Sequence, residues 1–196
     1  MVVFQDNRTG YYRIFETKID LDGNNISGTL QQVNSTTNNI QIMPAITTDF
    51  SGNYWIAYLE ELISGLTKSY IVYVDNRFNG TPNRSVNLNS DVIGPNQGQT
   101  VESGPFVDIA FVRKYGLVGV VYSIVDSGVT HVKLHVIEQY DLSTKGVVEV
   151  ETINAINISP RPTITSDNND GFYITYFNGN KNELHAKHIY VATYNS

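Results

Sequence analysis

The chain contains no cysteine, and this absence excludes several kinds of chemistry at once. Without thiols there are no disulfides, no zinc–thiolate sites and no cysteine nucleophile, and neither redox compartment is favoured. Charged residues are also few, at 16% of 196 residues, and acids outnumber bases to give a net charge of −6. Because the chain has no basic stripe to neutralise phosphates, we expect no nucleic-acid partner.

Long apolar runs are missing as well. No stretch approaches the roughly 18 apolar residues of a membrane span, and no basic-then-apolar signal peptide opens the chain. We therefore expect no membrane insertion and no signal peptide or transmembrane segment, and the sequence leaves the localisation unknown. Apolar residues still make up 41% of the chain, which is enough for a buried core.

The sequence does contain a repeated segment. Residues 44–58 read PAITTDFSGNYWIAY, residues 162–176 read PTITSDNNDGFYITY, and a looser copy covers residues 105–122. Each copy starts with proline, runs through a short apolar strand, turns at polar residues and glycine, and enters a second strand that ends in tyrosine. Because one such unit is too small to bury its own core, the repeat predicts several units packed together.

Two more strands are predicted after each second strand. Third strands are expected at 11–19, 69–78, 131–140 and 184–192, and fourth strands at 26–33, 84–88 and 147–153. Second strands such as 116–125 are almost continuously apolar, which predicts sheets covered on both faces. We interpret residues 59–66 as a strand-joining loop and not a helical turn, because the segment is short and contains Gly65.

Four antiparallel strands every ~55–60 residues are typical of β-propeller blades. We therefore predict an all-β, propeller-like fold with about four blades of up to four antiparallel strands, as one domain over residues 1–196. Blade boundaries are expected near 34–43, 89–104 and 154–160. The fold is expected to be incomplete at both ends, and unpaired apolar strand edges pair readily. At least one of the segments 1–9 and 184–192 should then pair with another chain or with sequence outside this one.

The turn in the first clear copy carries a family resemblance. The pattern Asp-x-x-Gly-Asn-x-x-hydrophobic at residues 49–56, preceded by Pro-x-Ile-x-x, resembles the repeat of bacterial and viral β-propeller proteins of unassigned activity. It is more distantly similar to the Asp-box turn of sialidase-type propellers, although the spacing from aspartate to glycine is one residue longer here. The resemblance covers almost the whole chain and implies structural roles: the aspartate caps a tight turn and the glycine supplies a positive φ.

Asp108 is the acidic residue that best suits catalysis. It lies in the middle of a predicted strand, where an unpaired charge is costly unless it faces a central channel. A glycosidase needs two carboxylates about 5–10 Å apart, and the sequence identifies no partner among Glu60, Glu61 and Glu102. The chain also lacks a nucleophile elbow, a phosphate-binding glycine loop and a His–Glu metal motif. We therefore predict no catalytic residue.

Thirteen tyrosines and one tryptophan stand on a polar, weakly charged background, a composition that suits sugar binding. The aromatic residues at repeat positions are expected in the core, where burial alone explains them; they are Tyr54, Trp55, Tyr58, Tyr122, Tyr173 and Tyr176. Tyr11, Tyr12 and Tyr70 lie at strand starts beside loops. These three, together with Asp108, are the candidate ligand-binding residues.

No metal or cofactor is expected. Residues 167–171 cluster aspartate and asparagine as calcium ligands would, but a calcium loop needs an acid where Ser166 stands, so we interpret the segment as a solvated turn. The histidines give no chelating pair on strands. His131 and His135 would lie about 13 Å apart, and the remaining two, His185 and His188, would point to opposite faces.

The leading functional hypothesis is a non-enzymatic binding or structural module that makes protein–protein or self-assembly contacts through its sheet edges. The asparagine-rich composition is compatible with a viral or surface component. A lectin-like, carbohydrate-binding propeller is the first alternative, and a glycoside-processing enzyme is the second.

Overall fold

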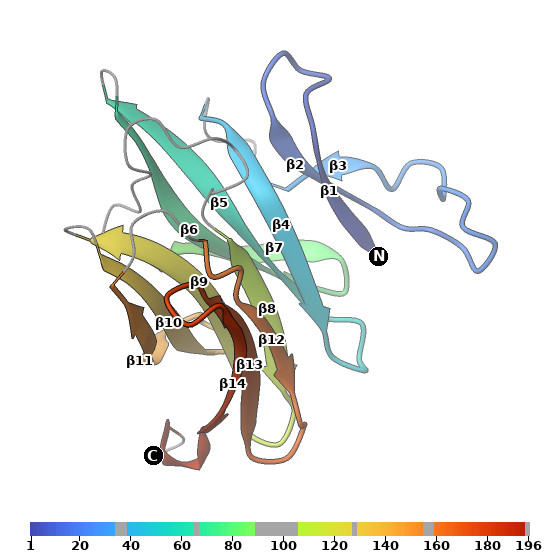
Figure 1. Cartoon of the computed structure of the whole chain (residues 1–196). Helices are drawn as coiled ribbons and strands as arrows, with labels where there is room; N and C mark the ends of the chain where they lie inside the picture. Colours follow the sequence, from blue (N-terminus) through green and yellow to red (C-terminus); the bar gives the residue numbers. More distant parts are fainter. Residues whose placement is uncertain (34–38, 65–66, 89–105, 127–128, 155–158, 195–196) are drawn as a thin grey trace.

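The computed structural model describes residues 1–196 except 34–38, 65–66, 89–105, 127–128, 155–158 and 195–196 (Figure 1). Every strand that it describes is paired in the antiparallel sense, in four separate sheets. A single 3-10 turn, η2 (Ala192–Tyr194), is the one helical element of the described residues. The prediction of an all-β chain is therefore confirmed. No described helix has the length and apolar character needed to cross a membrane.

The sheets follow one another along the chain and contain three, four, four and three strands. The first comprises β1 (Val2–Asp6), β2 (Arg13–Thr17) and β3 (Gln31–Gln32). The second comprises β4 (Gln41–Thr48), β5 (Tyr54–Ser64), β6 (Thr67–Phe78) and β7 (Thr81–Asn87). The third comprises β8 (Val107–Val112), β9 (Leu117–Asp126), β10 (Val129–Glu138) and β11 (Thr144–Ile153). The last comprises β12 (Thr163–Ser166), β13 (Gly171–Asn178) and β14 (Glu183–Tyr190).

The repeated segment forms the same kind of β-hairpin three times. The pairs β4–β5, β8–β9 and β12–β13 are all antiparallel, as predicted. Their first strands lie side by side, with β4 against β1 and β8, and β8 against β12. Pro44 lies in β4 at a bulge between Ile42 and Ala45, and Pro162 directly precedes β12. A proline is tolerated at such places because no ladder hydrogen bond needs its missing N–H.

The sheets pack face to face and bury three apolar cores, one at each junction between consecutive sheets. Strand β5 shows why its sequence does not alternate. Trp55, Ala57 and Leu59 enter the core shared with the third sheet, whereas Ile56 and Tyr58 enter the core shared with the first. Five of the six aromatic residues expected in the core are at most 3% exposed: Tyr54, Trp55, Tyr58, Tyr122 and Tyr176. The expectation is wrong for Tyr173, which is 45% exposed because it lies on the outward face of β13. Val120 and Ile174 are fully buried, as expected for these strands.

Two stretches differ from their predictions. Residues 59–64 were expected in a loop, but they continue β5 and pair with β6 as far as Ser64. Residues 26–33 were expected to form a strand, but only Gln31 and Gln32 do so. The chain before them folds on itself instead. Asp20 accepts hydrogen bonds from the N–H groups of residues 22 and 24, and Thr29 bonds the backbone of Lys18.

The two terminal segments do not pair with each other. Within the described residues β1 pairs only with β2, and β14 only with β13. Figure 1 shows the two ends of the chain well apart, so the strands that the structure describes do not close a ring. The prediction that an end pairs with another chain stays a prediction.

Candidate functional site

The predicted ligand-binding tyrosines separate into two groups. Tyr11 and Tyr12 precede β2 and are 58% and 46% exposed, and the Arg13 guanidinium lies 5.5 Å from the Tyr11 ring. Tyr70 is not exposed as expected. It lies in β6 opposite Glu61 of β5, and burial, reinforced by the Glu61 carboxylate, raises the pKa of its phenol to about 12. Tyr70 belongs instead to the core between the second and third sheets.

Asp108 forms a structural bridge. One carboxylate oxygen accepts a hydrogen bond from the N–H of Ile109 at 2.9 Å, and the other from the N–H of Ile164 at 3.0 Å. The second bond ties β8 to β12. Burial raises the pKa of Asp108, while these two backbone bonds oppose the shift. Both oxygens are thus engaged by backbone, and no described hydrogen bond or ring contact joins Asp108 to Tyr11, Tyr12 or Tyr70.

The outward face of the last sheet departs from the buried pattern of the other strands. On β13, Phe172, Ile174 and Tyr176 enter the core shared with the third sheet. Since side chains alternate along a strand, Tyr173 points the other way and is 45% exposed. On β14, Leu184 and Tyr190 are 75% and 63% exposed. We call Tyr173, Leu184, His188 and Tyr190 the outer face.

The first sheet does not present an equivalent apolar surface. Phe4 of β1 and Phe15 of β2 stack with ring centres 6.1 Å apart. The guanidinium of Arg8 lies 4.9 Å from the Phe15 ring, and Phe15 is only 6% exposed. Arg8 in turn bonds Asp6 at 2.6 Å. The two ends of the stack are therefore chemically different.

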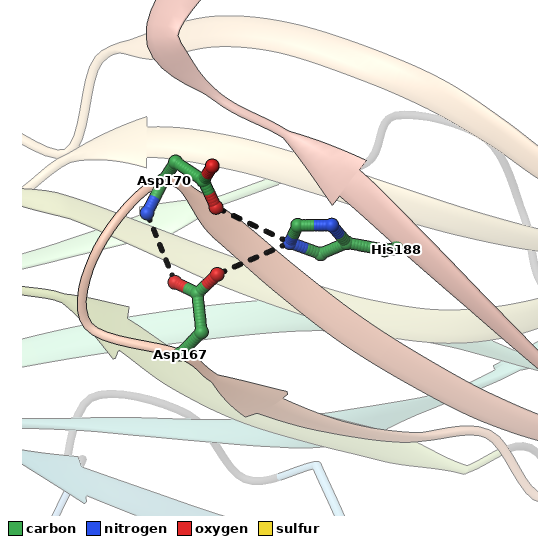
Figure 2. Close-up of side chains that lie close together, drawn as sticks. All are labelled: Asp167, Asp170 and His188. Atoms are coloured by element: carbon green, nitrogen blue, oxygen red, sulfur yellow. Dashed lines mark hydrogen bonds and ion pairs between the residues drawn. The ribbon is translucent and has the colours of Figure 1, made fainter.

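His188 occupies the centre of the outer face. Its ring stacks on Tyr173 at 4.2 Å and meets Tyr190 edge-on at 4.3 Å. Its Nε2 atom points at the turn between β12 and β13, where it lies 3.2 Å from Asp167 Oδ2 and 3.5 Å from Asp170 Oδ1 (Figure 2). Two carboxylates and an imidazole thus converge from two segments of the chain.

The backbone holds the Asp167 carboxylate in place. Its Oδ1 accepts hydrogen bonds from the N–H groups of Asn169, Asp170 and Gly171 at 2.8–3.1 Å. Burial alone would raise the pKa of Asp167, but these donors outweigh it and hold the pKa well below its usual range. The pKa of Asp170 is raised by its hydrogen bond to Asp167.

The solvated turn predicted at 167–171 is a turn in the structure, but the prediction missed His188. The histidine lies on another strand, and only the register that pairs Gly171 with Tyr190 brings it to the turn. The other histidines have separate surroundings. His131 bonds Glu149, His135 bonds Tyr122, and His185 faces Glu183.

A polar cleft of about 320 Å³ lies where the first strands of the last three sheets end. Its lining includes Thr47, Phe50, Arg113 and Asn168. It contains no pair of carboxylates.

Comparison of the chain with models of protein families, with curated proteins and with solved structures found no match.

Proposed function

We propose that the chain is a non-enzymatic β-propeller-type assembly module, in which the four sheets are blades and a second copy of the chain covers the outer face. The propeller assignment is supported by the sequence repeat, by the 3-4-4-3 strand count and by the side-by-side first strands. The assembly role is supported separately, by the exposure of the outer face.

One observation carries the assembly role: the outer face is exposed, whereas the corresponding face of the third sheet is buried. There, Val121 of β9 and Leu134 of β10 are fully covered by the last sheet. On the last sheet, no described strand covers Leu184 and Tyr190, which are 75% and 63% exposed. Exposed apolar side chains gathered on one face of two neighbouring strands suit an interaction site.

A second copy suits this face because the chain already makes three contacts of the same kind between its own sheets. Like faces from two copies meet in a closed, two-fold dimer. Pairing with the first sheet of another copy would instead set the outer face against the Phe4–Phe15 stack and the Arg8 guanidinium, which do not match it chemically. The two-fold arrangement is therefore the proposed one.

Light scattering coupled to gel filtration tests the proposal over a wide range of concentrations. The parent chain should be a dimer that dissociates on dilution, and Leu184→Glu should be a monomer with unchanged circular dichroism. Leu21→Glu is the matched control, because Leu21 is fully exposed outside the outer face.

A parent chain that stays monomeric at every concentration would refute self-assembly. Retention of the dimer in Leu184→Glu would move the interface away from the outer face. A monomeric parent that captures a glycan, with loss of capture in Tyr11→Ala, would favour the lectin alternative instead.

A further inference from the structure

The turn at 167–171 starts with an aspartate, as do two other turns of the chain, but the second carboxylate oxygen of this aspartate has a different partner. At Asp20 and Asp49, as at Asp167, one carboxylate oxygen accepts backbone N–H groups. The second oxygen of Asp20 accepts the side-chain amide of Asn24, and that of Asp49 accepts the amide of Asn53. In those two turns, both carboxylate oxygens of the aspartate therefore accept hydrogen bonds from groups of the same turn.

At the third turn, the position of these asparagines is occupied by Gly171, which offers no amide. The Oδ2 atom of Asp167 faces His188 Nε2 instead, with Asp170 Oδ1 beside it (Figure 2). A Cβ on residue 171 would lie 2.7 Å from this nitrogen. The absent side chain therefore leaves the space that the imidazole enters.

The Nε2 atom of His188 is shielded from solvent and makes no hydrogen bond of acceptable geometry. Its separations from the two carboxylate oxygens, 3.2 and 3.5 Å, are longer than the ~2.7–2.9 Å of a charge-assisted hydrogen bond. Two ligand atoms that each lie ~2.0–2.1 Å from a tetrahedral zinc ion are about 3.4 Å apart. The two separations from Nε2 therefore match edges of a zinc coordination tetrahedron.

We propose that Asp167 Oδ2, Asp170 Oδ1 and His188 Nε2 bind one divalent cation of the zinc class, with a water molecule as fourth ligand. The three ligand atoms lie within 4.8 Å of one another. An imidazole with two carboxylates suits zinc, whereas calcium requires about six to eight oxygen ligands. This site requires neither the propeller assignment nor self-assembly.

The surroundings already orient the ligands. Three backbone N–H groups fix the Asp167 carboxylate, so that its second oxygen points outward. Tyr173 and Tyr190 hold the His188 ring from two sides. A bound ion would fasten the β12–β13 turn to β14, which pairs with no other strand than β13 in the described part of the chain. We therefore expect the ion to stabilise the edge of the last sheet.

The test is calorimetric titration of zinc into the metal-free full chain at neutral pH. We expect one ion per chain and a rise in melting temperature with added zinc. His188→Gln and Asp170→Asn should each lower the affinity at least about tenfold, since even supporting residues of metal sites cost that much. His185→Gln is the matched control, because His185 also faces a carboxylate, Glu183, but lies on the opposite face of β14.

Absence of saturable binding by the parent chain would overturn the proposal, and so would equal affinities of the parent and the Asp170→Asn variant. Melting in the presence of a chelator checks that each variant is folded before titration. Titration with cobalt(II) tests the geometry, since a tetrahedral site gives strong visible absorption and an octahedral site gives weak absorption. A weak spectrum would contradict the tetrahedral arrangement.

Discussion

The sharpest stability prediction concerns Arg77, a buried cation between the first two sheets. Arg77 lies on β6, and its Nε is 3.3 Å from Glu16 Oε1 on β2. Its Nη2 lies 3.3 Å from Asp75 Oδ2 and donates to the Val33 carbonyl at 2.8 Å. All three charged side chains are at most 2% exposed. Arg77 therefore compensates two carboxylates that water does not reach.

Arg77→Met should remove the cation while keeping much of the side-chain volume. The two carboxylates would then remain buried without their partner, and the loss of one member of a buried ion pair costs about 3–5 kcal/mol. We expect the free energy of unfolding to fall by that amount at neutral pH. Urea denaturation, followed by the fluorescence of Trp55, measures it, since this single tryptophan is fully buried.

The pH dependence gives an independent check. Burial raises the pKa of Asp75, and Arg77 opposes this shift. A carboxyl whose folded pKa is raised contributes stability that is fully present below its unfolded pKa, about 3.9, and is lost as pH rises through the folded pKa. Removing Arg77 raises the folded pKa further. The deficit of Arg77→Met should therefore be largest at neutral pH and shrink on acidification.

Arg113→Met is the matched control, because Arg113 is exposed and its described side-chain contact is with the Phe50 ring. Its effect should stay below about 1 kcal/mol. The double variant Glu16→Gln/Arg77→Met should recover part of the loss. A deficit for Arg77→Met no larger than that of the control, or one independent of pH, would refute the reasoning.

Three further substitutions probe the core, the Asp108 bridge and the β12–β13 turn. Trp55→Ala should lower the free energy of unfolding by about 3–5 kcal/mol, measured by circular dichroism in urea, and a loss under about 1 kcal/mol would contradict the fully buried site. Asp108→Asn should cost about 1–3 kcal/mol in the same assay, because Ile109 and Ile164 bond different oxygens and an amide NH2, which cannot accept, would replace one of them. Gly171→Ala should cost about 1–3 kcal/mol or more, since the new Cβ would lie 2.3 Å from a backbone carbonyl of β14; an unchanged melting temperature would show that the turn is loose.

The hairpins and cores could be predicted because they depend on local patterns. Proline, a polar turn and an apolar run recur in the sequence, and each recurrence marks two adjacent strands. The almost continuous apolar run of β9 correctly indicated a sheet covered on both faces, with Val120 in one core and Val121 in the other. The pattern of apolar residues along one strand predicts whether its faces are buried, even when the neighbouring sheets are not known.

The missed features depend on contacts between distant residues. Arg77 and Glu16 are 61 positions apart and meet only because consecutive sheets stack. Residues 59–64 resemble a loop in composition, yet pairing with β6 makes them strand. A local pattern cannot decide such cases, because the free energy that fixes them comes from packing across sheets.

Comparison of the three aspartate turns indicates which of them can bind a ligand. In each of the three aspartate turns one carboxylate oxygen accepts backbone N–H groups, so a turn whose second oxygen also has a partner needs nothing further. The turns at Asp20 and Asp49 meet this condition through their asparagines. The turn at Asp167 lacks the asparagine, gains a second carboxylate and receives an imidazole from β14. A turn in which the second carboxylate oxygen has no partner is less stable, unless a group from elsewhere in the chain supplies that partner. The replacement at this turn is the His188 imidazole beside two carboxylate oxygens, the atoms that we propose to bind zinc, so the zinc titration tests whether a metal ion supplies the missing partner.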